Sequence, residues 1–75
     1  MESIRKLIIS GKEQLDCGNY DNALIFFEQA ISFDQKDPDL WNLKGIVLRS
    51  LGRYDEAISC FNKSLSIDPR DKNAS

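Results

Sequence analysis

Residues 38–71 read PDLWNLKGIVLRSLGRYDEAISCFNKSLSIDPRD, and they align without a gap with residues 4–37, IRKLIISGKEQLDCGNYDNALIFFEQAISFDQKD. A fixed period of 34 residues is the mark of a repeat protein, in which each unit buries its apolar face on its neighbour. Such arrays more often present surfaces for binding than sites of chemistry. Nine aligned positions are identical: Gly11/Gly45, Gly18/Gly52, Tyr20/Tyr54, Asp21/Asp55, Ala23/Ala57, Phe27/Phe61, Ser32/Ser66, Asp34/Asp68 and Asp37/Asp71.

Apolar residues within each repeat recur at helical spacing. Ala23, Phe27 and Ala30 fall at i, i+4 and i+7, and Ala57 and Phe61 follow the same pattern in the second repeat. This period predicts α-helices rather than strands. We therefore predict an all-α fold of two helix–turn–helix repeats, with helices over residues 3–17, 20–33, 38–51 and 54–67.

Glycine, aspartate and proline mark the predicted helix ends. Gly18 and Gly52 follow the first helix of each pair, where glycine enters the left-handed region without steric cost. Asp37-Pro38 suits a helix start, because aspartate accepts hydrogen bonds from unpaired amides and proline has no amide to leave unpaired. Proline cannot continue a helix, so we expect Asp68-Pro69 to end the last one.

Two glycines sit in the middle of predicted helices, where glycine costs up to about 1 kcal/mol relative to alanine. Gly11 and Gly45 occupy the same register of the two repeats. We interpret them as places where a bulky neighbour approaches the helix. Small Ala23 and Ala57 lie one turn before large phenylalanines, so we also predict that small and large side chains interlock where the paired helices cross.

Composition excludes several classes of function. The net charge of −2 does not favour nucleic acid, and no apolar run approaches the roughly 20 residues of a membrane span. The absence of histidine removes the commonest general base and metal ligand. No nucleophile, phosphate-binding loop or metal set accompanies the carboxylates, so we expect no enzyme activity, no metal and no cofactor. Without a secretory signal we expect a cytoplasmic protein with Cys17 and Cys60 as free thiols.

The chain resembles the tetratricopeptide repeat family, whose pattern is Trp-x2-Leu-Gly-x2-Tyr, then Ala-x3-Phe-x2-Ala, then Pro. The first repeat fits more loosely, with Leu7 for Trp, Ser10 for Leu, Gln14 for the aromatic and Gln35 for Pro. The second repeat departs chiefly at Lys44, where the family usually has leucine. It otherwise follows the pattern with Trp41, Gly45, Leu48 for the first Tyr, Gly52, Tyr54, Ala57, Phe61, Ser64 for the last Ala, and Pro69.

The resemblance implies a short right-handed superhelix whose first helices line a concave groove for a peptide or a partner's helix. Carried over position by position, the groove residues are Arg5, Ile8, Lys12, Leu15, Asp16, Asp39, Asn42, Ile46, Arg49 and Ser50. Ile8 and Ile46 are expected to lie partly exposed in the same place on successive repeats and to form an apolar contact there. The charged residues could contact a partner, but a solvated helix face explains them better. The clamp for terminal carboxylates in some members is not supported, because Ile8, Lys12 and Leu43 replace its Lys, Asn and Asn.

The last helix of a two-repeat array lacks the neighbour that the second helix has. By the repeat correspondence, Leu24, Ile31 and Phe33 pack on the third helix. Their counterparts Ile58, Leu65 and Ile67 then form an exposed face. The alternative function is therefore a structural self-association unit, a homodimer or a stack, that uses this face. We place the domain at residues 1–71, with 72–75 as a frayed tail or the start of a third repeat.

Overall fold

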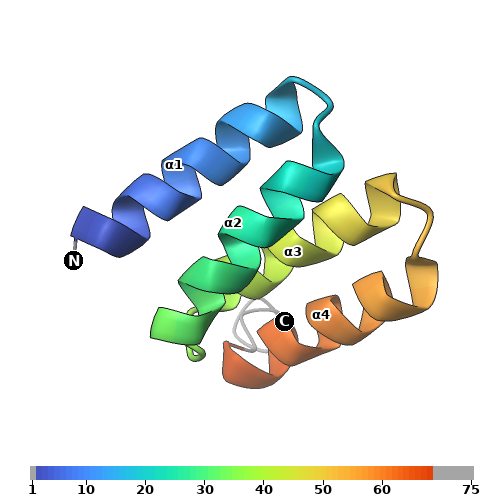
Figure 1. Ribbon diagram of the computed structural model, residues 1–75. Coiled ribbons are helices and arrows are strands. Elements are labelled where there is room, and N and C mark those ends of the chain that lie inside the picture. The colour runs from blue at the N-terminus through green and yellow to red at the C-terminus, as the bar shows by residue number, and fades with distance from the viewer. Residues whose placement is uncertain (1, 69–75) are drawn as a thin grey trace.

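The computed structural model describes residues 2–68, and four α-helices follow one another within them. They are α1 (Glu2–Asp16), α2 (Tyr20–Phe33), α3 (Pro38–Ser50) and α4 (Tyr54–Ile67). They form two antiparallel pairs, and α2 packs against α3 to join the pairs (Figure 1). The described residues include no strand, so the all-α prediction is confirmed, and each predicted helix end lies within one residue of the observed one. The predicted tail, residues 72–75, lies outside this part of the chain.

The turn inside each pair is built in the same way in both repeats. Gly18 and Gly52 have φ of 83° and 82°, the left-handed conformation predicted for them. The Gly18 amide donates to the Leu15 carbonyl at 3.1 Å, and the next amide donates to the Gln14 carbonyl at 2.8 Å. Arg49 and Leu48 accept the equivalent bonds after α3. These bonds satisfy the last carbonyls of each helix, so glycine lets the chain reverse without unpaired backbone groups.

Paired helices touch where the two mid-helix glycines meet the two phenylalanines. A Cβ atom built on Gly11 would lie 2.5 Å from Cε1 of Phe27, and one built on Gly45 would lie 2.5 Å from Cε1 of Phe61. No real Cβ atom approaches a carbon so closely. The prediction that glycine admits a bulky neighbour at this register is therefore confirmed in both repeats.

The two repeats join through the contact of α2 with α3. Leu24 and Phe27 of α2 share an apolar cluster with Val47, and Ile31 shares a second cluster with Leu40. The prediction that Leu24 and Ile31 are covered is thus confirmed, since both are nearly inaccessible.

The same prediction is wrong for Phe33, which is 64% exposed. Phe33 follows Ile31 by two residues, which turns its side chain about 200° around the helix axis, away from α3. Leu24 and Ile31 are seven residues apart, almost two full turns, and so share one face.

Two polar contacts fix the start of α3. Asp37 Oδ1 accepts a hydrogen bond from the Asp39 amide at 2.9 Å, and Pro38 occupies the first turn, as predicted. Ser64 Oγ, on α4, donates to the Pro38 carbonyl at 2.9 Å. Ser64 is buried at the position where the first repeat has Ala30. Without this hydrogen bond its hydroxyl group would be buried between the paired helices with no partner.

Candidate functional site

The ten predicted groove residues lie on α1 and α3, the first helix of each pair. They form five pairs at equivalent positions of the two repeats, and no pair carries the same residue twice. The pairs are Arg5/Asp39, Ile8/Asn42, Lys12/Ile46, Leu15/Arg49 and Asp16/Ser50. Gly11/Gly45, Ala23/Ala57 and Phe27/Phe61, where the paired helices cross, are identical in both repeats, whereas these five pairs differ, as do most of the aligned positions.

Three of the ten groove residues are apolar, and the structure separates their roles. Ile8 packs on the cluster of Ala30, Ile31 and Leu40, and Leu15 packs on the larger cluster. Ile46 is half-buried but joins neither cluster. The remaining seven are exposed. Ile46 is therefore the apolar side chain of this face that contributes least to the core.

The expectation that Ile8 and Ile46 occupy the same place on successive repeats is wrong. The offset of 34 residues pairs Ile8 with Asn42 and Ile46 with Lys12. Each helix thus offers one isoleucine and one polar residue at these two positions, in opposite order. A ligand would meet two apolar contacts placed diagonally rather than a row shared by both repeats.

The three cations of this face form no ion pair within the part of the chain that the structure describes. Two ion pairs occur among residues 2–68, Lys44 with Glu28 and Arg53 with Glu56. Neither includes Arg5, Lys12 or Arg49, and the described residues give these three cations no other charged partner. With Asp16 and Asp39, the face carries three positive and two negative charges, against −2 for the whole chain.

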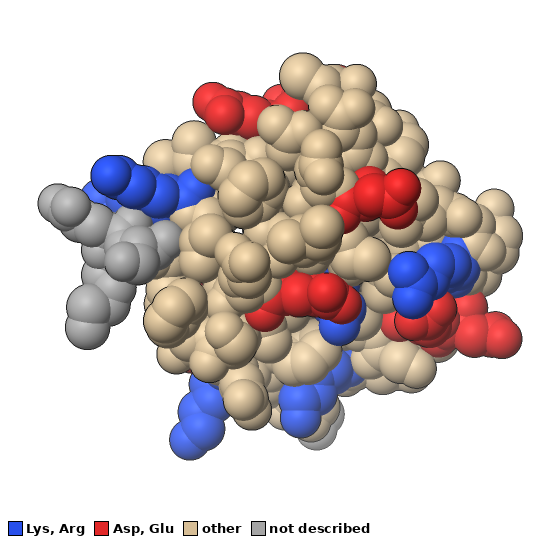
Figure 2. Space-filling view, in the orientation of Figure 1, with Lys and Arg blue, Asp and Glu red and all other residues tan. Residues whose placement is uncertain are grey.

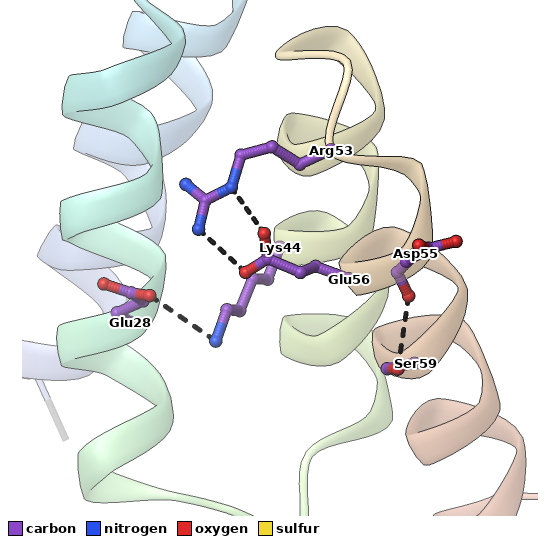
Figure 3. Close-up of polar contacts among 6 residues, drawn as sticks. All are labelled: Glu28, Lys44, Arg53, Asp55, Glu56 and Ser59. Atoms are coloured by element: carbon purple, nitrogen blue, oxygen red, sulfur yellow. Dashed lines mark hydrogen bonds and ion pairs between the residues drawn. The ribbon is translucent and has the colours of Figure 1, made fainter.

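A second polar region, which sequence reasoning missed, connects α2, α3 and α4 (Figure 3). Lys44 Nζ lies 3.5 Å from Glu28 Oε2 and 5.6 Å from the centre of the Trp41 ring. Arg53 donates two hydrogen bonds to the carboxylate of Glu56, at 2.6 and 2.7 Å, and these lower the pKa of Glu56. No signal in the sequence connects Glu28 with Lys44, since they lie in different repeats.

Lys44 therefore fills a position where leucine was expected by burying its aliphatic stem and turning its ammonium group outward. Lys63 Nζ approaches the same Trp41 ring, at 5.9 Å. An open hollow of about 360 Å³ lies here, lined by Trp41, Lys44, Leu48, Glu56, Ser59, Cys60 and Lys63. Lys44 pairs with Glu28 and Glu56 pairs with Arg53, and exposed ion pairs contribute little to stability. We assign it a structural role.

Charged groups of both signs are scattered over the side of the molecule shown in Figure 2, and uncharged residues cover most of it. Within residues 2–68, no cluster of His, Cys, Asp and Glu could hold a metal ion. In the same part of the chain, no helix is long and apolar enough to cross a membrane. Cys17 and Cys60 are both free, as predicted, and burial raises the pKa of the Cys60 thiol.

The predicted self-association face is partly as expected. Ile58 and Leu65 are exposed, whereas Ile67 is half-buried. Ile67 follows Leu65 by two residues, so its side chain points about 200° around the helix axis from that of Leu65. The same rotation places Phe33 outside the contact of α2 with α3. Tyr54 and Phe61 lie on the side of α4 that carries Ile58 and Leu65, and sequence reasoning did not include them.

Family comparison covers both repeats. A family model described as tetratricopeptide repeat matches residues 38–71, and a second model with the same description matches residues 7–37. The chain belongs to the tetratricopeptide repeat family. A comparison with curated proteins finds no match.

Tetratricopeptide repeats generally serve as modules for protein–protein interaction and are typically not enzymes. Family membership explains why the same glycine, alanine and phenylalanine positions recur in both units here. Family membership does not show whether a partner binds the face formed by α1 and α3 or the outer face of α4. That choice depends on the side chains of this chain.

Proposed function

We propose that this tetratricopeptide repeat chain binds a segment of another protein, a peptide or a helix, along the face formed by α1 and α3. The observation that carries the proposal is the set of five residue pairs described above. Every pair differs between the repeats, and the cations among them have no charged partner in the described part of the chain. Arg5, Lys12 and Arg49 are therefore available to a ligand.

The chemistry of these pairs indicates the kind of segment that fits. Ile8 and Ile46 supply two separated apolar contacts, and Arg5, Lys12 and Arg49 supply positive charge around them. A complementary segment carries aspartate or glutamate with one or two large apolar side chains. Opposite charges across an interface speed association and disfavour wrong partners more than they add affinity, while the apolar anchors supply most of the binding energy.

The test is a selection of displayed random peptides against the purified chain, followed by synthesis of the enriched sequences. We expect enrichment of acidic residues together with Leu, Ile or Phe. Ile46→Ser combined with Arg49→Glu should weaken binding about tenfold, which corresponds to 1.4 kcal/mol. Ile25→Ser is the matched control, because Ile25 is an exposed isoleucine of α2.

Ile46 is preferred over Ile8 for this test because Ile8 also packs on a core cluster. Loss of Ile8 would mix weaker binding with weaker folding. Circular dichroism should show unchanged helicity for the Ile46 and Ile25 variants. Enriched peptides that are basic, or whose binding shifts the amide resonances of residues outside α1 and α3, would contradict the proposal.

A further inference from the structure

The hollow beside Trp41, called the Trp41 hollow below, is lined by one row of side chains from each helix of the second pair. Each row follows the spacing i, i+3 or i+4, and i+7, which keeps its members on one side of the helix. A ligand there would therefore contact both helices at once. The rows are Trp41, Lys44 and Leu48 on α3, and Glu56, Ser59, Cys60 and Lys63 on α4.

The charges of the Trp41 hollow occur in the second repeat alone. None of the seven equivalent residues of the first repeat is charged, and Ser10 and Gln29 stand in the places of the two lysines. Because the first repeat forms the same helix pair without them, the lysines are not needed to bring the two helices together. The seven residues are Leu7, Ser10, Gln14, Asn22, Ile25, Phe26 and Gln29.

The indole ring of the hollow is held in place. Trp41 is half-buried, packs on both apolar clusters, and donates a hydrogen bond from Nε1 to the Gln35 carbonyl at 2.9 Å. Lys44 Nζ and Lys63 Nζ, one from each helix, lie 5.6 and 5.9 Å from the centre of the ring. A ligand would thus meet a ring that is already fixed, and little side-chain freedom at the floor is lost on binding.

The two ammonium groups offer more hydrogen bonds than the fold accepts. Each has three N–H donors. Lys44 has one carboxylate neighbour, Glu28, at 3.5 Å, and Lys63 forms no ion pair within residues 2–68. The carboxylate that lines the hollow, Glu56, already accepts two hydrogen bonds from Arg53 (Figure 3). The hollow therefore has positive charge to offer an anion.

The shape and the lining of the hollow discriminate among anions. It is open to solvent, whereas sites for free small molecules bury about 70–90% of the ligand surface. Its floor is apolar, with Trp41, Leu48 and Cys60, and an inorganic anion has no apolar part to cover it. A glutamate or aspartate side chain on a protein surface has both a carboxylate and methylene groups, and the protein around it would close the open side.

We propose that the Trp41 hollow receives an acidic side chain of a partner protein, glutamate or aspartate, with its carboxylate paired with Lys44 and Lys63 and its methylene groups on the indole ring. The site is separate from the face formed by α1 and α3. Lys44 is two residues from Asn42 and from Ile46, so its side chain points about 200° around the α3 axis from both. A protein bound at the hollow leaves that face open to a second segment.

The experiment uses the intact chain and a pair of small probes. Trp41 is the only tryptophan of the chain, so its fluorescence and its indole N–H resonance report on the hollow directly. The probes are N-acetyl-glutamate N-methylamide and its uncharged match, N-acetyl-glutamine N-methylamide. At low salt we expect the glutamate probe to bind at least about threefold more tightly, the factor that one unit charge about 6 Å away supplies in water. Acetate should bind more weakly than the glutamate probe, because it lacks the methylene groups that cover the ring.

Variants locate the binding. Lys63→Gln should abolish the preference for the glutamate probe, whereas Lys63→Arg, which keeps the charge, should retain it. Lys6→Gln is the matched control, because Lys6 is an exposed lysine of α1 and its loss changes the net charge equally. Ile46→Ser with Arg49→Glu should also leave the preference unchanged, so failure of this proposal and failure of the site on α1 and α3 are distinguishable.

Quenching of Trp41 by iodide gives a second measurement. Relative to uncharged acrylamide, iodide should quench about threefold less in the Lys63→Gln variant than in the unaltered chain, and equally in the Lys6→Gln variant. Three outcomes would overturn the proposal: equal binding of the two probes, a preference that survives Lys63→Gln, and a stronger response to inorganic phosphate than to the glutamate probe. The last would assign the hollow to a free anion. Should Lys63→Gln lower helicity, the two probes compared on the unaltered chain decide.

Discussion

Replacing the mid-helix glycines with alanine should have unequal effects in the two repeats. In both, the new Cβ atom would lie 2.5 Å from a phenylalanine ring carbon, well inside the 3.5–4.0 Å of an ordinary carbon contact. The ring must therefore move by about 1 Å. Phe27 is fully buried and has no room to move, whereas Phe61 of α4 is only half-buried and can turn toward solvent.

The magnitudes follow from two opposing terms. Overpacking a buried site costs about 1–3 kcal/mol, and alanine in place of glycine returns up to about 1 kcal/mol of helix propensity. For Gly11→Ala we expect the upper part of the overpacking range and a net loss of about 1–2 kcal/mol. For Gly45→Ala the overpacking cost lies in the lower part of that range and nearly equals the gain in helix propensity. The net change in the free energy of unfolding should therefore stay within about 0.5 kcal/mol. A domain of this size has about 4–11 kcal/mol in total.

Urea unfolding followed by circular dichroism measures both free energies. In a thermal melt, the Gly11 variant should lose about 4–8 °C for each kcal/mol. A double-mutant cycle adds a check: Phe27→Leu should cost less in the Gly11→Ala background, because the smaller side chain relieves the contact. Equal losses for the two glycine variants, or a larger loss at Gly45, would refute the argument that the exposure of the ring decides the cost.

Three further predictions test polar contacts and thiols. Ser64→Ala should lower the free energy of unfolding by about 1 kcal/mol, because it removes the bond to the Pro38 carbonyl, and urea titration measures this. Asp37→Ala should cost about 1 kcal/mol through the lost cap of α3, seen as a lower melting temperature. An aromatic disulfide reagent should modify exposed Cys17 in the folded chain, and Cys60 only after unfolding, because burial raises the pKa of its thiol.

The backbone could be predicted from the sequence because the deciding signals are local and occur twice. Gly18 and Gly52 specify the turns, and the spacing of Ala23 and Phe27 specifies the helix face. The approach of a bulky side chain to Gly11 could also be predicted, since only a close neighbour explains glycine in mid-helix, but its identity as Phe27 comes from the structure. Each of these inferences needs nothing beyond the period of a helix and the steric freedom of glycine.

Side-chain surroundings were harder, for two physical reasons. Repeat correspondence was applied to Phe33 without the rotation of about 100° per residue that turns it away from Ile31. The pairing of Lys44 with Glu28 depends on how the two repeats sit together, which local pattern does not encode. The core role of Ile8 could not be predicted, because it depends on the packing of α1 on its neighbours.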